Sequence, residues 1–365
     1  MGDDIDERYM RMALHLALKG IGRTSPNPMV GAVLVRGGRI VGTGYHRQAG
    51  GDHAELAALK QAGNRARGAT LYLNLEPCDH QGKTPPCTHS LIQSGVKKVV
   101  AGMLDPNPLV SGRGFRRLRR ARIQVHSDVL KRECRRLNEA FIKFITHQVP
   151  FVILKLAASL DGSIATSTGD SRWITDVAAR RYVHQLRNQV DAILVGVGTV
   201  VADDPRLTCR LAGGRDPWRV ILDGHLRIPL TACLFQQRGS GRTIVVTGAR
   251  VPPGKVKTIE LLGAHIWRFP FRGRWIPFNA LLKRLAKMGL VSVMIEGGGT
   301  TAARALLEGV VDKVLFFYAP KIIGGEGKRM IGALGIEKMS GCKNIKDVEI
   351  KRFGKDVLVS GYLNS

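Results

Sequence analysis

HAELAALK at residues 53–60 and EPCDHQGKTPPC at residues 76–87 are the stretches that decide how this chain folds. The first predicts a helix that starts after a loop, and the second predicts a polar loop between a buried strand and another helix. His53, Cys78 and Cys87 would then supply one imidazole and two thiolates. Zinc accepts that donor set and keeps a fourth position open for water.

Glu55 stands two residues after His53, near enough to reach such a water without binding the metal. Zinc lowers the pKa of bound water toward ~7, so Glu55 could carry a proton from that water to a leaving amine. His-x-Glu followed by Pro-Cys is the arrangement of zinc-dependent deaminases. Each half of the motif alone would be weak evidence for a deaminase site, because His-x-Glu occurs by chance and cysteine pairs are often structural. The two together, with a strand between them, indicate a deaminase site.

The cysteine spacing departs from the generic nucleobase-deaminase motif, Cys-x-x-Cys. Here eight residues separate Cys78 from Cys87, and the insert DHQGKTPP contains His80 and Lys83. A His and a Lys beside a catalytic metal could hold an anionic or polar substrate. The alternative is a loop that simply spans further.

Length and composition predict a soluble, cytoplasmic protein of two domains. The chain has 365 residues, of which 44% are apolar, enough for ordinary packed cores. No stretch approaches the ~20 uninterrupted apolar residues of a membrane span, and the acidic start, MGDDIDERYM, is unlike a secretory signal. Four cysteines lack a partner at metal spacing and are expected to be reduced structural thiols: Cys134, Cys209, Cys233 and Cys342.

The formal net charge is +27, which predicts attraction to anions such as nucleic acid, membrane phosphates or phosphorylated metabolites. Basic runs at residues 116–122 and 131–143 could be binding surfaces or solvated helix faces. Charge alone does not choose among these partners.

Apolar periodicity predicts two α/β blocks. The helical pattern over 128–147 ends before Pro150, which cannot continue a helix, so we expect domains at 1–148 and 149–365. The first block reads as a helix over 6–19, a Gly-Gly hairpin within 30–45, and alternating helices and strands from His53 onward. The second reads as strands beginning near 151, 192, 219, 243, 291 and 314, with helices over 176–188, 278–289 and 300–308.

The second block lacks the Gly-x-Gly-x-x-Gly dinucleotide fingerprint. VMIEGGGTTAARALL, residues 293–307, predicts instead a buried strand, three glycines and a helix whose N-terminus could hold a phosphate. An ordinary strand–turn–helix connection is the alternative.

Taken in order, these motifs resemble one family along nearly the whole chain. PNPMVGAVLV, HAE, LEPC…GKTPPC and DPNP are similar to the deaminase half of the bifunctional riboflavin-biosynthesis deaminase–reductases. LKLAASLDG, GDSRWIT, VGVGTVVADDPRLT, IEGGGT and APKIIGG are similar to the reductase half. The resemblance implies an N-terminal cytidine-deaminase-like three-layer α/β/α domain and a C-terminal dihydrofolate-reductase-like α/β domain. It also accounts for the long cysteine spacing.

The resemblance further implies zinc-dependent deamination of a diaminopyrimidinone ribosyl phosphate, followed by NADPH reduction of the ribosyl chain to ribityl. His53, Cys78 and Cys87 would bind zinc, with Glu55 as the proton shuttle. The pyrimidine pocket would use Asn27, His80, Lys83, Asp105 and Asn107. NADPH would contact Ala157, Trp173, Thr199, Asp203, Gly298, Gly299, Thr300, Thr301, Ala302, Ala303 and Arg304. The reductase substrate would contact Ser171, Arg187, Leu207, Arg210 and Glu296.

Each of these secondary roles has a structural alternative. Asn27, Asp105 and Asn107 stand beside prolines and could be turn residues, Trp173 could be core, and Arg187 could be a solvated helix residue. Asp79 stands where relatives often have Ser, and Asp52 precedes His53; both add negative charge near the metal and could alter affinity. Gly224 follows Asp223 where some relatives have Ser, so one cofactor hydrogen bond could be absent.

The alternative function is a nucleic-acid deaminase of the tRNA type with a basic appended domain. The charge favours it, but an aromatic content of 6% is thin for stacking bases. The ordered reductase-like segments would also have no use there. We therefore expect a phosphorylated small-molecule substrate, no nucleic-acid partner, no membrane partner and, from the relatives, a homo-oligomer.

Overall fold

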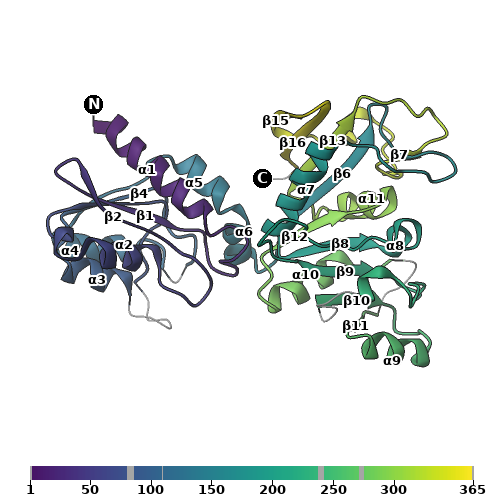
Figure 1. Ribbon diagram of the computed structural model, residues 1–365, viewed down its shortest axis with the longest axis horizontal. Coiled ribbons are helices and arrows are strands. Elements are labelled where there is room, and N and C mark those ends of the chain that lie inside the picture. Colours follow the sequence, from purple (N-terminus) through teal and green to yellow (C-terminus); the bar gives the residue numbers. More distant parts are fainter. Residues whose placement is uncertain (1, 80–85, 109, 237–241, 271–274, 364–365) are drawn as a thin grey trace. The chain divides into compact units, whose positions relative to one another are not determined.

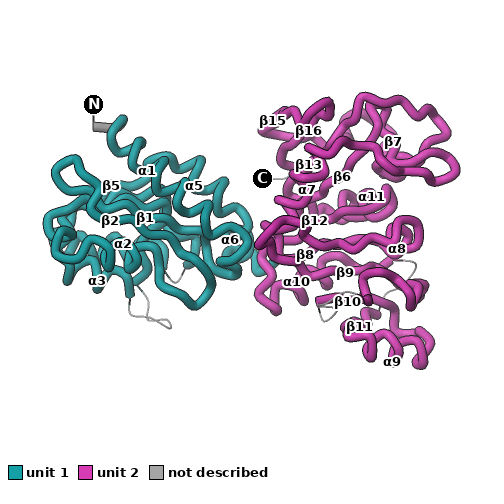
Figure 2. Tube along the Cα trace, viewed as in Figure 1, with its two compact units in different colours: residues 1–149 teal, residues 150–365 magenta. Residues whose placement is uncertain are grey.

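The computed structural model describes the whole chain except residues 1, 80–85, 109, 237–241, 271–274 and 364–365. The chain divides into two compact units, residues 1–149 and 150–365 (Figure 2). Each unit has its own hydrophobic core. The predicted substrate residues His80 and Lys83 lie outside the described residues.

The first unit is built on a five-stranded sheet in the order β2-β1-β3-β4-β5 (Figure 1). β1 pairs antiparallel with β2 and β3, whereas β3, β4 and β5 run parallel. The strands are β1 (Gly31–Arg36), β2 (Arg39–Tyr45), β3 (Thr70–Leu73), β4 (Lys98–Ala101) and β5 (Gln124–His126). The helices are α1 (Gly2–Leu18), α2 (Ala54–Ala62), α3 (Cys87–Gln93), α4 (Arg113–Arg120), α5 (Lys131–Leu137) and α6 (Glu139–His147), with a 3₁₀ turn η1 (Gly63–Ala66).

Helices cover both faces of this sheet. A Cβ on Gly31 would point at α1, 2.0 Å from the Ala13 carbonyl, whereas one on Gly44 would point at α2, 2.3 Å from the Ala54 carbonyl. Gly44 pairs with Ala32, the residue after Gly31, and successive side chains on a strand point to opposite faces. α1 and α2 therefore lie on opposite faces, which confirms the predicted α/β/α layers.

Glycine lets α2 sit unusually close to β2. Cβ atoms at Gly42 and Gly44 would both lie 2.3 Å from carbonyl oxygens of α2, a separation that real Cβ atoms do not reach. Any side chain at either position would lift the helix from the sheet. Because His53 and Glu55 lie at the N-terminal end of α2, this contact also sets the position of the candidate metal site.

The second unit contains, among its described residues, a nine-stranded sheet in the order β11-β10-β9-β8-β12-β6-β13-β16-β15 and a separate β14-β7 pair. The strands from β11 to β13 run parallel, and β16 and β15 add antiparallel at the edge. The central strands are β6 (Phe151–Ser159), β8 (Ala192–Gly196), β9 (Trp218–Leu222), β12 (Ser292–Glu296) and β13 (Lys313–Ala319). The others are β7 (Ser163–Ala165), β10 (Thr243–Thr247), β11 (His265–Arg268), β14 (Lys328–Arg329), β15 (Lys346–Phe353) and β16 (Asp356–Tyr362).

Two hydrophobic cores lie on the two faces of this sheet. Val152 and Leu154 of β6 pack into one core, with α10 and α11, while Ile153 packs into the other, with α7 and α9. This alternation is what a strand buried on both faces requires. The helices are α7 (Val177–Gln189), α8 (Val197–Asp203), α9 (Pro253–Leu261), α10 (Phe278–Lys287) and α11 (Gly299–Leu307), with 3₁₀ turns η2 (Cys233–Phe235) and η4 (Met339–Gly341).

Across the described residues, no helix combines the length and the apolar character that crossing a membrane would take.

Candidate functional sites

The first site brings together the predicted metal ligands. Nδ1 of His53, at the N-cap of α2, lies 3.2 Å from Cys87 Sγ and 3.5 Å from Cys78 Sγ. All three donor atoms lie within 4.8 Å of one another. Ligands of one tetrahedral zinc ion are separated by roughly 3.6 Å, given Zn–S and Zn–N bonds of about 2.3 and 2.0 Å. The donor set therefore fits zinc in both chemistry and spacing.

The electrostatics of this cluster favour a metal and a proton carrier. A hydrogen bond from the Cys87 thiol, aided by His53 and opposed by burial, lowers the pKa of Cys78 to about 4. A thiolate, the form that ligates metals, is thus available at neutral pH. Burial, together with the charge of Cys78, raises the pKa of Glu55 to about 7. Glu55 is 4% exposed, so a carboxyl group beside the metal ligands is shielded from water.

Asn27, Asp105 and Asn107 lie in loops tied to this site. The amide Nδ2 of Asn27 is 3.1 Å from His46 Nε2, and the His46 ring contacts that of His53 edge-on at 5.6 Å. The Asn107 N–H donates to the Asp105 carboxylate at 2.8 Å. Their roles in binding a pyrimidine stay predictions.

Glu76 of the EPC motif has a role that sequence reasoning did not assign. It is 3% exposed, and its carboxylate accepts three backbone N–H groups. Oε2 accepts from Asp105 at 3.1 Å and Gly112 at 2.9 Å, and Oε1 accepts from Phe115 at 3.1 Å. Gly112 is the N-cap of α4 and has no side chain to cap it, so Glu76 caps this helix from a distant point in the chain. The same carboxylate fixes the loop that carries Asp105 beside the Cys78 segment.

The two extra acidic residues near the metal ligands are paired with basic residues. Asp79 accepts from Arg117 at 2.8 Å and from the Thr88 hydroxyl at 2.6 Å. Asp52 forms an ion pair with Lys60 at 2.6 Å. Their charges are therefore largely compensated by neighbours.

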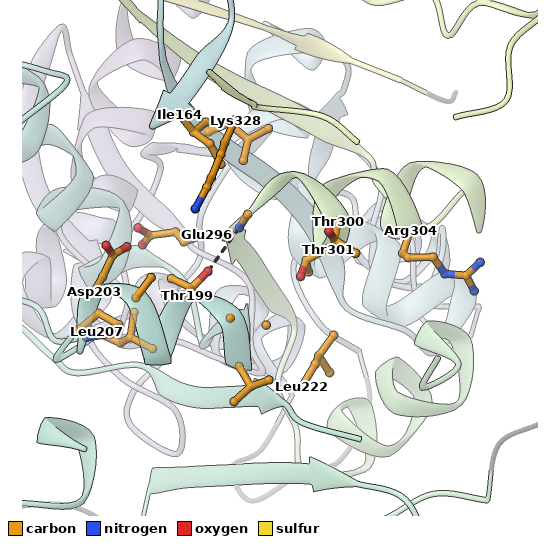
Figure 3. A pocket seen from close by; sticks show the side chains of 18 of the residues that line it. Ile164, Thr199, Asp203, Leu207, Leu222, Glu296, Thr300, Thr301, Arg304 and Lys328 are labelled. Carbon is orange, nitrogen blue, oxygen red and sulfur yellow. Dashed lines mark hydrogen bonds between the residues drawn. The ribbon is translucent and has the colours of Figure 1, made fainter. Parts of the chain in front are cut away.

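The second site is a cavity of about 620 Å³ in the second unit. It lies where β6, β8, β9 and β12 end, as ligand sites of open α/β sheets do. Figure 3 shows Glu296 and Thr199 between Lys328 on one side and Leu222 on the other. Eleven of the predicted cofactor and substrate residues line it: Ala157, Ser171, Arg187, Thr199, Asp203, Leu207, Glu296, Gly298, Thr300, Thr301 and Arg304.

A buried ion-pair cluster stands at one end of this cavity. Arg187 Nε and Nη2 donate to the two carboxylate oxygens of Glu296 at 2.8 and 3.0 Å, and Lys155 Nζ lies 3.7 Å from Glu296. Burial by itself would raise the pKa of Glu296, but the charges of Arg187 and Lys155 outweigh it and lower the pKa to about 2. Arg187 is thus a paired residue of the site and not a solvated helix residue.

The backbone at Gly298, in the glycine segment after β12, is accessible from the cavity, and a phosphate site requires such access. The Gly298 N–H donates to Thr199 Oγ1 at 3.3 Å, and a Cβ on Gly298 would meet nothing closer than that oxygen, 4.0 Å away. α11 begins at Gly299, so free N–H groups of its first turn lie beside this open backbone. The segment therefore fits a phosphate group of a dinucleotide.

Five predicted residues do not line the cavity. Ala302 and Ala303 are buried in the core, and a Cβ on Gly299 would meet the Arg329 carbonyl at 2.5 Å, so these three pack inward. Trp173 is 60% exposed with the Arg180 guanidinium 4.5 Å above its ring. Arg210 is exposed, and its N–H donates to His184. Their predicted contacts stay untested predictions.

Other lining residues were not selected from the sequence. They include Lys155, His225, Arg227, Trp275 and Lys328. These come from separate segments with no shared motif, and only the fold brings them to one cavity.

Comparison with known proteins extends over both units. Residues 3–103 match the family model described as the cytidine and deoxycytidylate deaminase zinc-binding region, and residues 150–359 match the RibD C-terminal domain. The riboflavin biosynthesis protein RibD of Synechocystis sp. is 45% identical over 98% of this chain and 96% of its own length. That of Aquifex aeolicus is 44% identical over 98% of both.

Solved structures agree with these matches along the full chain. Acinetobacter baumannii RibD, form 1, superposes with a TM-score of 0.89 at 36% identity and 100% coverage of both chains. The Thermotoga maritima diaminohydroxyphosphoribosylaminopyrimidine deaminase/5-amino-6-(5-phosphoribosylamino)uracil reductase superposes with a TM-score of 0.88 at 39% identity, again covering both chains fully.

Proposed function

This chain belongs to the RibD family of riboflavin-biosynthesis proteins and is a bifunctional enzyme with a deaminase and a reductase domain, and on that premise we propose which residues perform each reaction. We assign the deaminase to residues 1–148 and the reductase to residues 149–365. The substrates we propose are those in the name of the Thermotoga relative. The observation that carries the assignment is the convergence of His53, Cys78 and Cys87 beside Glu55.

In the deaminase, His53, Cys78 and Cys87 would hold zinc, which makes a water acidic enough to ionise near neutral pH. The Glu55 carboxylate would take a proton from the attacking water and deliver it to the amine that leaves the pyrimidine ring. A C–O bond forms as the C–N bond breaks, and ammonia is released. The buried setting of Glu55 keeps bulk water from competing for this proton.

In the reductase, the open backbone at Gly298 and the first turn of α11 would hold the NADPH pyrophosphate, and NADPH supplies the hydride that converts the ribosyl chain to ribityl. Arg187, held in a fixed plane by Glu296, would orient the phosphorylated substrate. Ser171, which donates to Asp203, lines the same cavity and would contact the substrate too.

The test uses the full chain and separates the two activities. Purified protein should contain about one zinc per chain, and it should consume NADPH when given the deaminated ribosylaminouracil phosphate directly. Glu55→Gln should keep the zinc and the NADPH consumption and lose ammonia release. Normal deamination by Glu55→Gln would refute its assigned role, and absence of NADPH consumption would refute the reductase assignment.

We further propose that the enzyme acts in the cytoplasm as a homo-oligomer and that nucleic acid is not its partner. The cysteines are all unpaired, as expected in a reducing compartment. Measuring the molecular mass in solution tests whether the protein is a homo-oligomer. A binding titration with tRNA at physiological salt tests whether nucleic acid is a partner.

A further inference from the structure

One wall of the reductase cavity has no regular secondary structure of its own. Residues 204–217, which the structure describes in full, form neither helix nor strand between α8 and β9. Pro205 and Leu207 of this connection line the cavity, and Figure 3 shows Leu207 on the side of the cavity opposite Arg304. Partners elsewhere in the fold must therefore supply hydrogen bonds that keep this wall in place.

The backbone of Leu207 is in a conformation that its surroundings have to hold. Its φ is 51°, in the left-handed region that residues other than glycine rarely adopt, and its side chain is 2% exposed. Such a conformation persists only where neighbouring contacts fix it. The hydrogen bonds of the next three residues in the chain help to fix it.

Helix α7 makes a bond to each of these three residues. Arg187 Nη1 donates to the Thr208 carbonyl at 3.1 Å. His184 stands three positions earlier, on the same helix face, and its Nδ1 accepts the Arg210 N–H at 3.3 Å. The Cys209 thiol donates to the His184 carbonyl at 3.5 Å. The segment that follows Leu207 is thus tied to one turn of α7.

The bond from Arg210 requires a neutral imidazole. A backbone N–H can only donate, so Nδ1 of His184 carries no proton when this bond is formed. A proton on Nδ1 would place two donors face to face and break the bond. The charged ring would also compete with Arg187 for the Thr208 carbonyl. Protonation of His184 would therefore break one bond that holds the segment and weaken another.

The groups around the half-buried His184 keep its ring neutral at pH 7. Burial lowers its pKa, and the positive charges of Arg187, on the same helix, and Arg210, on the segment, lower it further. Glu296 of β12 and the Thr208 carbonyl raise the pKa, but the lowering effects outweigh them. Because the ordinary pKa of histidine is about 6.5, the charged ring becomes important only below neutral pH.

Resting on the proposed reductase function, we propose that neutral His184 is a positioning residue that holds the 207–210 segment in the geometry that binds the phosphorylated pyrimidine. His184 acts through the segment, because Leu207 lines the cavity and His184 is not among the lining residues. An interaction that supports ground state and transition state equally changes KM and leaves kcat unchanged. Loss of the Nδ1 acceptor should therefore appear in the KM for the pyrimidine substrate.

The experiment measures NADPH consumption by the full chain, with the deaminated ribosylaminouracil phosphate supplied at varied concentration. At pH 7.5, His184→Phe, which keeps a ring and removes the acceptor, should raise KM about fivefold and change kcat by less than about twofold. His184→Asn, whose Oδ1 can accept where Nδ1 did, should keep KM within about twofold. His265→Asn, at an exposed histidine of the same unit outside the cavity lining, is the matched control and should change neither constant.

The pH dependence separates positioning by a neutral imidazole from a merely structural role. The substrate phosphate itself titrates near pH ~6, so the quantity to compare is the KM of the unsubstituted protein divided by that of His184→Asn at the same pH. This ratio should rise at least ~threefold between about pH 7.5 and pH 5, because only the unsubstituted protein has an imidazole to protonate at this position. The corresponding ratio for His265→Asn should stay constant.

Failure of this inference differs from failure of the proposed function. An unchanged KM for His184→Phe, or a KM ratio to His184→Asn that stays flat as the pH is lowered, would overturn the inference while the reductase stands. If His184→Phe does not fold, the pH dependence of that ratio decides by itself. If the unsubstituted protein consumes no NADPH with this substrate at neutral pH, the reductase assignment itself is wrong.

Discussion

Replacing Glu76 by Gln tests whether one buried carboxylate organises the deaminase domain. Gln has the same shape but a single acceptor oxygen, and Glu76 accepts three N–H groups. If that oxygen stays with Asp105 and Gly112, the amide NH₂ faces the Phe115 N–H and leaves it unpartnered. Losing one bond to a charged group costs about 1.5–3 kcal/mol, and the two survivors become neutral and weaken by roughly 1 kcal/mol together. We expect a loss of about 2.5–4 kcal/mol in the unfolding free energy of the first unit.

The assay is urea unfolding of the zinc-loaded full chain, with hydrogen exchange followed on peptides covering residues 105–115. Glu76→Gln should lower the first unit's midpoint and speed exchange in that segment. Glu7→Gln is the matched control, since Glu7 forms a half-exposed i,i+4 pair with Arg11 that is worth less than about 0.5 kcal/mol. Equal midpoints for the two variants, with unchanged exchange at 105–115, would refute the capping role.

The remaining predictions concern both sites. Cys87→Ser should reduce zinc content from about one per chain to a small fraction, measured by atomic absorption, while NADPH consumption continues; retained zinc would remove Cys87 from the ligand set. Gly44→Ala should displace α2, because its Cβ would lie 2.3 Å from the Ala54 carbonyl. It should lower the free energy of unfolding by more than about 2 kcal/mol and remove most deaminase activity. An unchanged melting temperature would contradict the close contact. The pKa of Glu296 is lowered from 4.5 to about 2, so its carboxylate contributes about 3 kcal/mol of stability that is present above pH 4.5 and lost as the pH falls toward 2. Urea unfolding of the second unit at pH 7 and pH 3 should show about 2 kcal/mol of this loss, because pH 3 still lies above the folded pKa, and Glu296→Gln should show a smaller loss. Arg187→Met leaves the buried Glu296 carboxylate with Lys155 as its remaining ion-pair partner and should destabilise the second unit by about 3–5 kcal/mol, measured by urea unfolding at pH 7. If the double variant Arg187→Met/Glu296→Gln is no more stable than Arg187→Met alone, the ion pair between Arg187 and Glu296 is not the cause of the loss.

Local patterns in the sequence were sufficient for most elements of the fold. The strand at 151–159 and the helix at 177–189 follow from apolar periodicity, and the hairpin turn follows from Gly37 and Gly38, which both adopt positive φ. The edge hairpin β15–β16 was missed, because β15 is mostly exposed and its polar residues show no buried alternation.

The metal site could also be predicted from the sequence, for a related reason. His53, Cys78 and Cys87 are reactive residue types at motif spacing, and their chemistry hardly depends on the rest of the chain. The sequence by itself thus determined most of the elements, the metal donor set and the family.

Only the tertiary structure decided how distant residues act together. Glu76 reaches Phe115 across 39 positions and Arg187 reaches Glu296 across 109, and no periodicity reports such pairs. The order of parallel strands decided that the turn after β9 and the glycine segment after β12 face one cavity. The physical reason is range: propensity and motif chemistry act within a few residues, whereas partners of buried charges are set by which strands lie side by side in the folded sheet.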